Sequence, residues 1–199
     1  MNQPVPKSAP LNRASTGPFD VSEVIGLDNS MDFGAIKVLP IEGVEIRLEI
    51  EETSQRVVAV TLELDQSTLQ LQAFAAPKNE GVWNDVRGQL AASIESQGGV
   101  AEERLGSFGA ELFVKLPIVE NGVNVGSRNG RFIGVDGPRW FLRGLIAGAA
   151  MTDPAAASRV EALYRSVAVD RGAEPIPPRE LLTLSVPDGV VAPPRGALA

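Results

Sequence analysis

Two arginines flank a pair of aromatic residues in the segment DGPRWFLRG, residues 136–144. Arginine binds carboxylates and phosphates through paired N–H donors, and a neighbouring aromatic ring adds stacking. If this segment is a strand, Arg139, Phe141 and Arg143 share one face, because side chains alternate along a strand. Trp140 then points to the other face. The spacing therefore predicts a surface that could bind an anionic small molecule, a carboxylate-bearing peptide or a nucleotide.

The charge around this segment leaves two interpretations open. Residues 115–144 contain five basic side chains against two acidic ones, whereas residues 42–65 contain seven carboxylates against two arginines. The arginines could pair with those acidic strands in one sheet, which would be a structural role. Alternatively they bind a ligand or partner, and the candidate residues are then Asp136, Arg139, Trp140, Phe141, Arg143 and Arg131, with Glu111 as a further acidic group. A concave pocket at this patch would favour the ligand, and a self-paired face would favour the structural role.

The acidic stretch has two interpretations of its own. Alternation places Glu45, Glu49 and Glu51 on one face of a strand, where carboxylate oxygens could bind a divalent cation. A solvated outer face that discourages edge-to-edge aggregation explains the same charges. We favour the solvated face and predict no metal site.

The residue types of the chain exclude several common chemistries. It has no cysteine and no histidine, which removes disulfides, thiolate and histidine zinc sites, and the Ser-His-Asp triad. No phosphate-binding glycine loop and no GxSxG turn are present. The sequence therefore does not favour an enzyme, and it predicts no cofactor.

Charge and hydrophobicity predict a compartment and narrow the partners. The formal net charge of −7 disfavours nucleic acid as a partner, since phosphate binding needs a basic surface. The first 20 residues lack the apolar run of a secretory signal. The most apolar segment, WFLRGLIAGAAM, includes Arg143 and is well short of the roughly 20 residues that span a bilayer. We expect a cytoplasmic protein that binds no membrane and has a protein partner, with a homodimer left open.

The hydrophobic pattern predicts the elements that hold these residues. Alternation predicts strands over 44–52, 56–65 and 67–77, an antiparallel meander that an earlier strand over 36–41 could join. Spacing of three and four predicts a helix over 79–98 with Asn79 as N-cap, and a second helix over 153–167 opened by Asp153 and Pro154. Strands over 109–119 and 130–148 lie between the helices, joined by a Gly/Asn-rich loop over 120–130.

This order of elements predicts one α+β domain over residues 20–186, with disordered tails over 1–19 and 187–199. We expect an antiparallel sheet of about six to seven strands, with two main helices packed against one face. The layout is similar to that of type III secretion chaperones and their non-secretory relatives.

Several separated motifs resemble one protein family. They are GPFDVSEV, MDFGAIKVLPIEGVEIRLE, LQLQAFAAPKNEGVWNDVRGQL, DGPRWFLRG and PIPPRELLTL, which together extend over residues 17–187. The chain resembles an actinobacterial family of cytoplasmic proteins that share a domain of unknown function. The resemblance implies that source and compartment, and it transfers no activity and no site residue.

Two functions follow from these observations as expectations. The preferred one is a non-catalytic, chaperone- or adaptor-like module that binds a protein segment through an open sheet face or strand edge. The alternative is a binding protein or weak enzyme for an anionic small molecule or nucleotide, which would use the Arg/Trp patch.

Overall fold

A computed structural model describes residues 5–187 of the chain and shows an α+β fold, as predicted. Its main sheet has seven strands and is antiparallel throughout. In spatial order the strands are β4 (Glu45–Ile50), β5 (Val57–Leu64), β6 (Ser67–Ala75), β10 (Trp140–Gly148), β9 (Val123–Asp136), β8 (Gly109–Glu120) and β7 (Val100–Gly106). The segment DGPRWFLRG thus leads into a central strand of the sheet.

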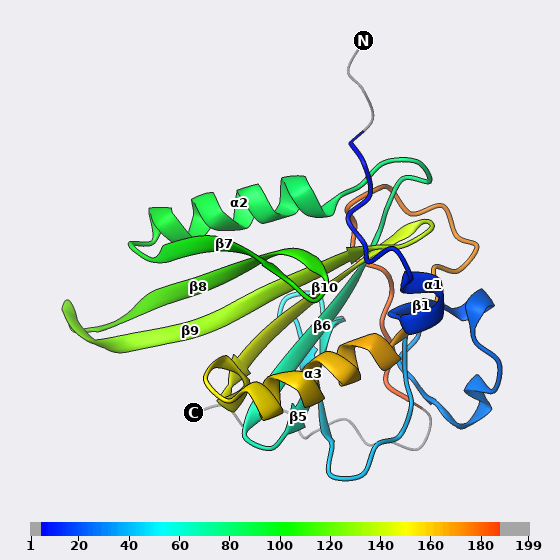
Figure 1. Ribbon diagram of the computed structural model, residues 1–199, viewed down its shortest axis with the longest axis horizontal. Coiled ribbons are helices and arrows are strands. Elements are labelled where there is room, and N and C mark those ends of the chain that lie inside the picture. The colour runs from blue at the N-terminus through cyan, green and yellow to red at the C-terminus, as the bar shows by residue number, and fades with distance from the viewer. Residues whose placement is uncertain (1–4, 188–199) are drawn as a thin grey trace.

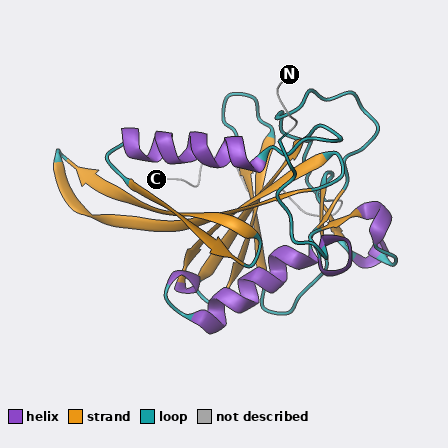
Figure 2. Cartoon of the chain, turned by 45° about the horizontal axis from the view of Figure 1, so that its top comes forward, coloured by secondary structure: helices purple, strands orange, loops and turns teal. Residues whose placement is uncertain are grey.

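A smaller four-stranded sheet lies beside the main one (Figure 2). Its strands are β1 (Phe19–Asp20), β11 (Ala168–Val169), β3 (Ile36–Val38) and β2 (Met31–Asp32), and β1 and β11 run parallel. The helical elements are α1 (Arg13–Thr16), α2 (Trp83–Ser96) and α3 (Pro154–Ser166), with the 3-10 turns η1 (Val21–Glu23), η2 (Leu27–Asn29) and η3 (Ala149–Met151). Within residues 5–187 no helix is both long and apolar enough to cross a bilayer.

The two main helices cover opposite faces of the seven-stranded sheet (Figure 1). Helix α3 packs on the face that holds Trp140 and Leu142, and this is the larger core. Helix α2 packs on the face that holds Phe141. The prediction that both helices share one face was therefore wrong, because each helix has its own apolar stripe and neighbouring residues of β10 supply a partner surface on each side.

Alternation of polar and apolar residues explains the central strands. Along β6 the residues Ser67, Leu69, Leu71, Ala73 and Ala75 are buried while those between them are partly buried. Helix α3 also begins as predicted, since the Asp153 carboxylate accepts a hydrogen bond of 2.9 Å from the Ala155 N–H. The structure thus confirms the predicted meander and the predicted second helix.

The structure adds strand where the sequence predicted loop. Only Asn121 and Gly122 turn the chain between β8 and β9, both with positive φ (51° and 78°), as a tight two-residue hairpin requires. The remainder of residues 120–130 is strand. Strand β7 was missed altogether, because its sequence VAEERLG is rich in charge and it lies at the exposed edge of the sheet.

The N-terminal segment is packed rather than free. Residues 5–19 were predicted to be a disordered tail, yet the Val5 carbonyl accepts a hydrogen bond from Gly81 N–H (2.8 Å) and the Ser8 carbonyl accepts one from Asp136 N–H (2.9 Å). These pairings satisfy backbone groups that composition alone could not match with partners. Residues 1–4 of that predicted tail, and 188–199 of the C-terminal one, lie outside the described residues.

We expect Gly134→Ala to destabilise the fold. A Cβ at Gly134 would lie 2.4 Å from the Trp83 ring, and overpacking of this kind typically costs about 1–3 kcal/mol. The matched control is Gly88→Ala in α2, where a Cβ meets nothing within 4 Å and alanine should stabilise the helix by about 0.5–1 kcal/mol. Urea unfolding of both variants measures the difference, and equal stabilities would contradict this packing of α2 on the sheet.

Candidate functional site

The structure distributes the six predicted site residues over several places instead of one patch. Arg131 lies on the α3 side of the sheet, and Trp140 lies in the core on that same side. Asp136 ends β9, and Arg139 is exposed in the turn before β10. Only Phe141 and Arg143 remain together, on the α2 face, as strand alternation predicted.

Asp136 has a structural role. Its carboxylate is only 2% exposed and accepts hydrogen bonds of 2.9 Å from Ser8 N–H and 2.9 Å from Val82 N–H, with Trp83 N–H at 3.5 Å. Burial raises the pKa of Asp136, and these backbone donors act against that rise. The N-terminus of helix α2 is therefore capped by a carboxylate from strand β9. The predicted cap Asn79 lies outside the helix, which begins at Trp83.

Arg131 is neutralised inside the protein. Its guanidinium forms ion pairs of 2.6 Å with Glu111 on β8 and 2.6 Å with Glu161 on α3. Glu111 is 0% exposed and also accepts a hydrogen bond from Phe108 N–H. The pair follows the structural interpretation, although its carboxylates come from β8 and α3 instead of the acidic meander, and it leaves neither residue for a ligand.

Trp140 and Arg139 also lie apart from Phe141 and Arg143. Trp140 is fully buried, and its indole N–H donates to the Asp20 carboxylate at 2.9 Å. Arg139 contributes its backbone carbonyl, which accepts a hydrogen bond from Ala76 N–H at 3.0 Å, while its side chain is exposed. The expected pair of arginines around an aromatic residue is thus reduced to Arg143.

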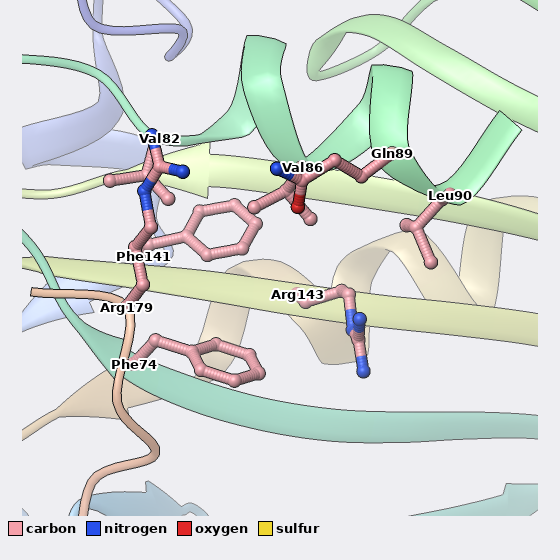
Figure 3. A pocket seen from close by; sticks show the side chains of 8 residues that line it. All are labelled: Phe74, Val82, Val86, Gln89, Leu90, Phe141, Arg143 and Arg179. Atoms are coloured by element: carbon pink, nitrogen blue, oxygen red, sulfur yellow. The ribbon is translucent and has the colours of Figure 1, made fainter. Parts of the chain in front are cut away.

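Phe141 and Arg143 line a cavity of about 250 Å³ between α2 and the sheet (Figure 3). The sheet contributes these two residues and Phe74 from β6. Helix α2 and the residue before it contribute a second wall, formed by Val82, Val86, Gln89 and Leu90. Phe141 is held between aromatic neighbours, since its ring centroid lies 5.8 Å from that of Phe74 and 5.7 Å from that of Trp83.

Arg143 brings an uncompensated charge into this mostly apolar cavity. Its guanidinium donates a hydrogen bond to the side-chain oxygen of Gln72 and lies 5.4 Å from the Phe74 ring centroid. Within the described residues 5–187 no carboxylate forms an ion pair with it. Burial lowers the pKa of Arg143, yet a guanidinium stays protonated at neutral pH. The cavity therefore offers a positive charge that no carboxylate within residues 5–187 neutralises.

A second arginine stands at the mouth of the cavity. Arg179 lies on the segment after β11 and forms an ion pair with Asp85 in the first turn of α2. Its backbone has a φ of 73°, which residues other than glycine adopt rarely. The two side chains are about half exposed, at 49% and 46%, so this pair is open to competition from a ligand.

Acidic side chains of the meander bind basic and polar side chains of the meander itself. Glu63 pairs with Arg47 at 3.0 Å, and Glu49 accepts hydrogen bonds from Thr61 and Gln70, each at 2.7 Å. Among the residues that the structure describes, no three acidic side chains gather in a way that could hold a metal ion. This face supplies Arg143 with the Gln72 side chain but, within residues 5–187, with no carboxylate, so the interpretation that pairs the arginines with the acidic strands does not hold for Arg143.

The long hairpin of β8 and β9 is a second surface feature. Strand β10 pairs with β9 only over residues 131–136, and β7 reaches β8 only as far as Lys115, so the outer part of the hairpin has open edges. Figure 1 shows it projecting beyond the other strands. Three valines on it are exposed, Val119 (58%), Val123 (63%) and Val125 (55%). We call residues 116–130 the ribbon.

Comparison with known proteins places the chain in a sequence family. Residues 17–192 match the family described as Protein of unknown function (DUF3710). The chain belongs to the DUF3710 family. Among solved structures, the DUF3710 chain is similar to the solution structure of cyanobacterial PsbP (CyanoP) from Synechocystis sp. PCC 6803, with a TM-score of 0.41 and 14% identity over 68% of this chain and 86% of that chain. Comparison with curated proteins gives no match.

Local sequence patterns predicted some of the residues that line this cavity of the DUF3710 protein, but not all of them. They placed Phe141 and Arg143 on one face and predicted the apolar stripe of α2 that includes Val86 and Leu90. Alternation along β6 could have placed Phe74 on the same face as Phe141, if the pairing of the two strands had been known. No local pattern points to Arg179, because it reaches the cavity from a segment without regular structure.

We expect Arg131→Met to destabilise this DUF3710 protein by about 3–5 kcal/mol, because it leaves the buried Glu111 carboxylate without its cation. Arg128→Met on the exposed part of β9 is the matched control and should change stability by less than about 0.5 kcal/mol. Adding Glu111→Gln to Arg131→Met should restore part of the loss, since a neutral amide needs no counter-charge. Chemical denaturation measures all three, and similar values for Arg131→Met and Arg128→Met would contradict the structural role.

Proposed function

We propose that this protein is a non-catalytic binding module, and that the cavity between α2 and the sheet takes a small anionic ligand with an apolar body. One observation supports this above all others: the Arg143 guanidinium is partly buried among Phe74, Phe141 and Leu90 and has no carboxylate partner among residues 5–187. A buried cation is ordinarily paired, and a ligand anion would supply that pair.

The surroundings of Arg143 support the proposal in two further ways. The hydrogen bond to Gln72 and the neighbouring Phe74 and Phe132 rings hold the guanidinium in place before a ligand arrives, which lowers the entropic cost of binding. The walls are mostly apolar with few polar groups, as is usual in small-molecule sites. A cavity of about 150 Å³ already holds benzene, so this one has room for a ring and a short acidic chain.

We also propose a cellular location and a source for this protein. The motifs that resemble an actinobacterial family support a cytoplasmic location in such an organism. Fractionation of the native cells, followed by immunodetection, would test the location.

We expect two-dimensional NMR titration to detect binding of at least one of two anionic probes, 3-phenylpropionate and 2-phenylethyl phosphate, with shifts centred on α2 and β10. The neutral 3-phenylpropanamide should bind more weakly. Arg143→Gln should weaken binding by about 10- to 100-fold, which corresponds to the loss of a charge-assisted hydrogen bond. Arg139→Gln is the matched control, because that arginine is exposed and lies outside the cavity lining, and it should leave binding unchanged.

The result that would contradict the proposal is equally definite. If neither anion binds, or if both bind equally to wild type and to an Arg143→Gln variant of unchanged melting temperature, the cavity is not an anion site.

A second candidate function rests on the ribbon. We infer that its open β9 edge pairs with a second copy of the chain, which would make the protein an interaction module through strand addition. The exposed Val123 and Val125 would be buried by this pairing. Arg128 is the one charged residue among 123–130, so two antiparallel β9 edges that meet about Gly126 place it opposite Asn124 and bring no like charges together.

We expect wild-type protein to show a concentration-dependent dimer in sedimentation velocity, and Val125→Lys to be monomeric, because a charge at that position opposes burial of the ribbon. Val100→Lys on β7 is the control, since it makes the same change at an exposed valine outside the ribbon. A wild-type chain that stays monomeric at every concentration would overturn this candidate.

A further inference from the structure

We propose that the cavity selects singly charged carboxylates over doubly charged phosphates, an inference that rests on the anion-binding function proposed above. No carboxylate within residues 5–187 pairs with Arg143, whereas Arg179 is balanced by Asp85, so the described lining and its immediate ion pair present one net positive charge. A ligand with one negative charge completes the balance.

A second negative charge has no such partner. Asp85 forms an ion pair with Arg179, which lines the cavity, so its carboxylate lies close enough to repel an additional anion. The Phe74, Val86 and Leu90 side chains form apolar walls near Arg143, where charges are screened less than in bulk water. A phosphate dianion would therefore either remain partly uncompensated or have to displace Asp85 from Arg179.

The hydrogen-bond donors at the site also match a carboxylate. A guanidinium has five N–H donors in a planar fork, and Gln72 takes one of them from Arg143. An edge of the fork matches the two oxygens of a carboxylate, which is the usual bidentate geometry. The further oxygens of a phosphate would need donors from Arg179, which Asp85 holds, or from Gln89 on α2.

The size and lining describe the rest of the ligand. The cavity of about 250 Å³ is smaller than most sites for drug-sized ligands, which begin at roughly 300 Å³. Its walls are the Phe74 and Phe141 rings on one side and aliphatic side chains of α2 on the other. The ligand class is therefore a small monocarboxylate with an aromatic ring or a short aliphatic chain.

The test compares the dissociation constants of 3-phenylpropionate and 2-phenylethyl phosphate at a pH where the phosphate is a dianion. In wild type we expect the carboxylate to bind at least about tenfold more tightly, as like-charge repulsion predicts for the dianion. Asp85→Asn removes the negative charge that pairs with Arg179, so it should improve phosphate binding more than carboxylate binding and reduce the ratio severalfold. Glu95→Gln, at the far end of α2, is the control for net charge and should preserve the ratio.

Each other result overturns a defined part of the inference. Equal or tighter binding of the phosphate by wild type overturns the carboxylate selectivity and leaves the proposed anion site standing. A ratio that is the same in Asp85→Asn and in wild type overturns the role of Asp85. Failure of wild type to bind either probe removes the proposed function itself, and the selectivity with it.

Discussion

The arrangement of this fold depends most on the backbone hydrogen bonds that the buried Asp136 carboxylate accepts. Asp136 ends β9 and accepts backbone hydrogen bonds from Ser8 and Val82, so it joins the N-terminal segment and the start of α2 to the centre of the sheet. The first N–H groups of a helix have no partner within the helix, and in α2 none of the preceding side chains supplies one. Asp136 thus helps to fix the start of the helix that forms one wall of the cavity.

Two arginines on neighbouring strands have different partners, because they lie on opposite faces of the sheet. Arg131 on β9 meets Glu111 and Glu161 and becomes part of the contact between α3 and the sheet. Arg143 on β10 faces α2, whose inner side presents Val86 and Leu90 instead of a carboxylate. The α3 face is therefore a closed core that contributes to stability, and the α2 face holds a cation with no carboxylate partner within residues 5–187.

The contacts around the cavity differ in how firmly they hold its parts. The aromatic stack of Phe74, Phe141 and Trp83 fixes the floor of the cavity, and the packing of Trp83 against Gly134 fixes the helix above it. Only the half-exposed pair of Arg179 and Asp85 at the mouth is held by an interaction that is weak in water. A rigid interior with one labile ion pair suits a site that recognises charge without moving the backbone.

The sequence by itself determined the α+β class, the meander, both main helices and the placement of Phe141 and Arg143 on one face, because alternation and helical spacing are local patterns that each segment contains in full. Tertiary structure alone decided that Asp136 caps α2, that Arg131 is neutralised while Arg143 is not, and that Arg179 joins the cavity. These contacts join residues 20 to 94 positions apart. The energy of a charge depends on what lies within a few ångströms of it, and only the folded chain brings such distant segments that close.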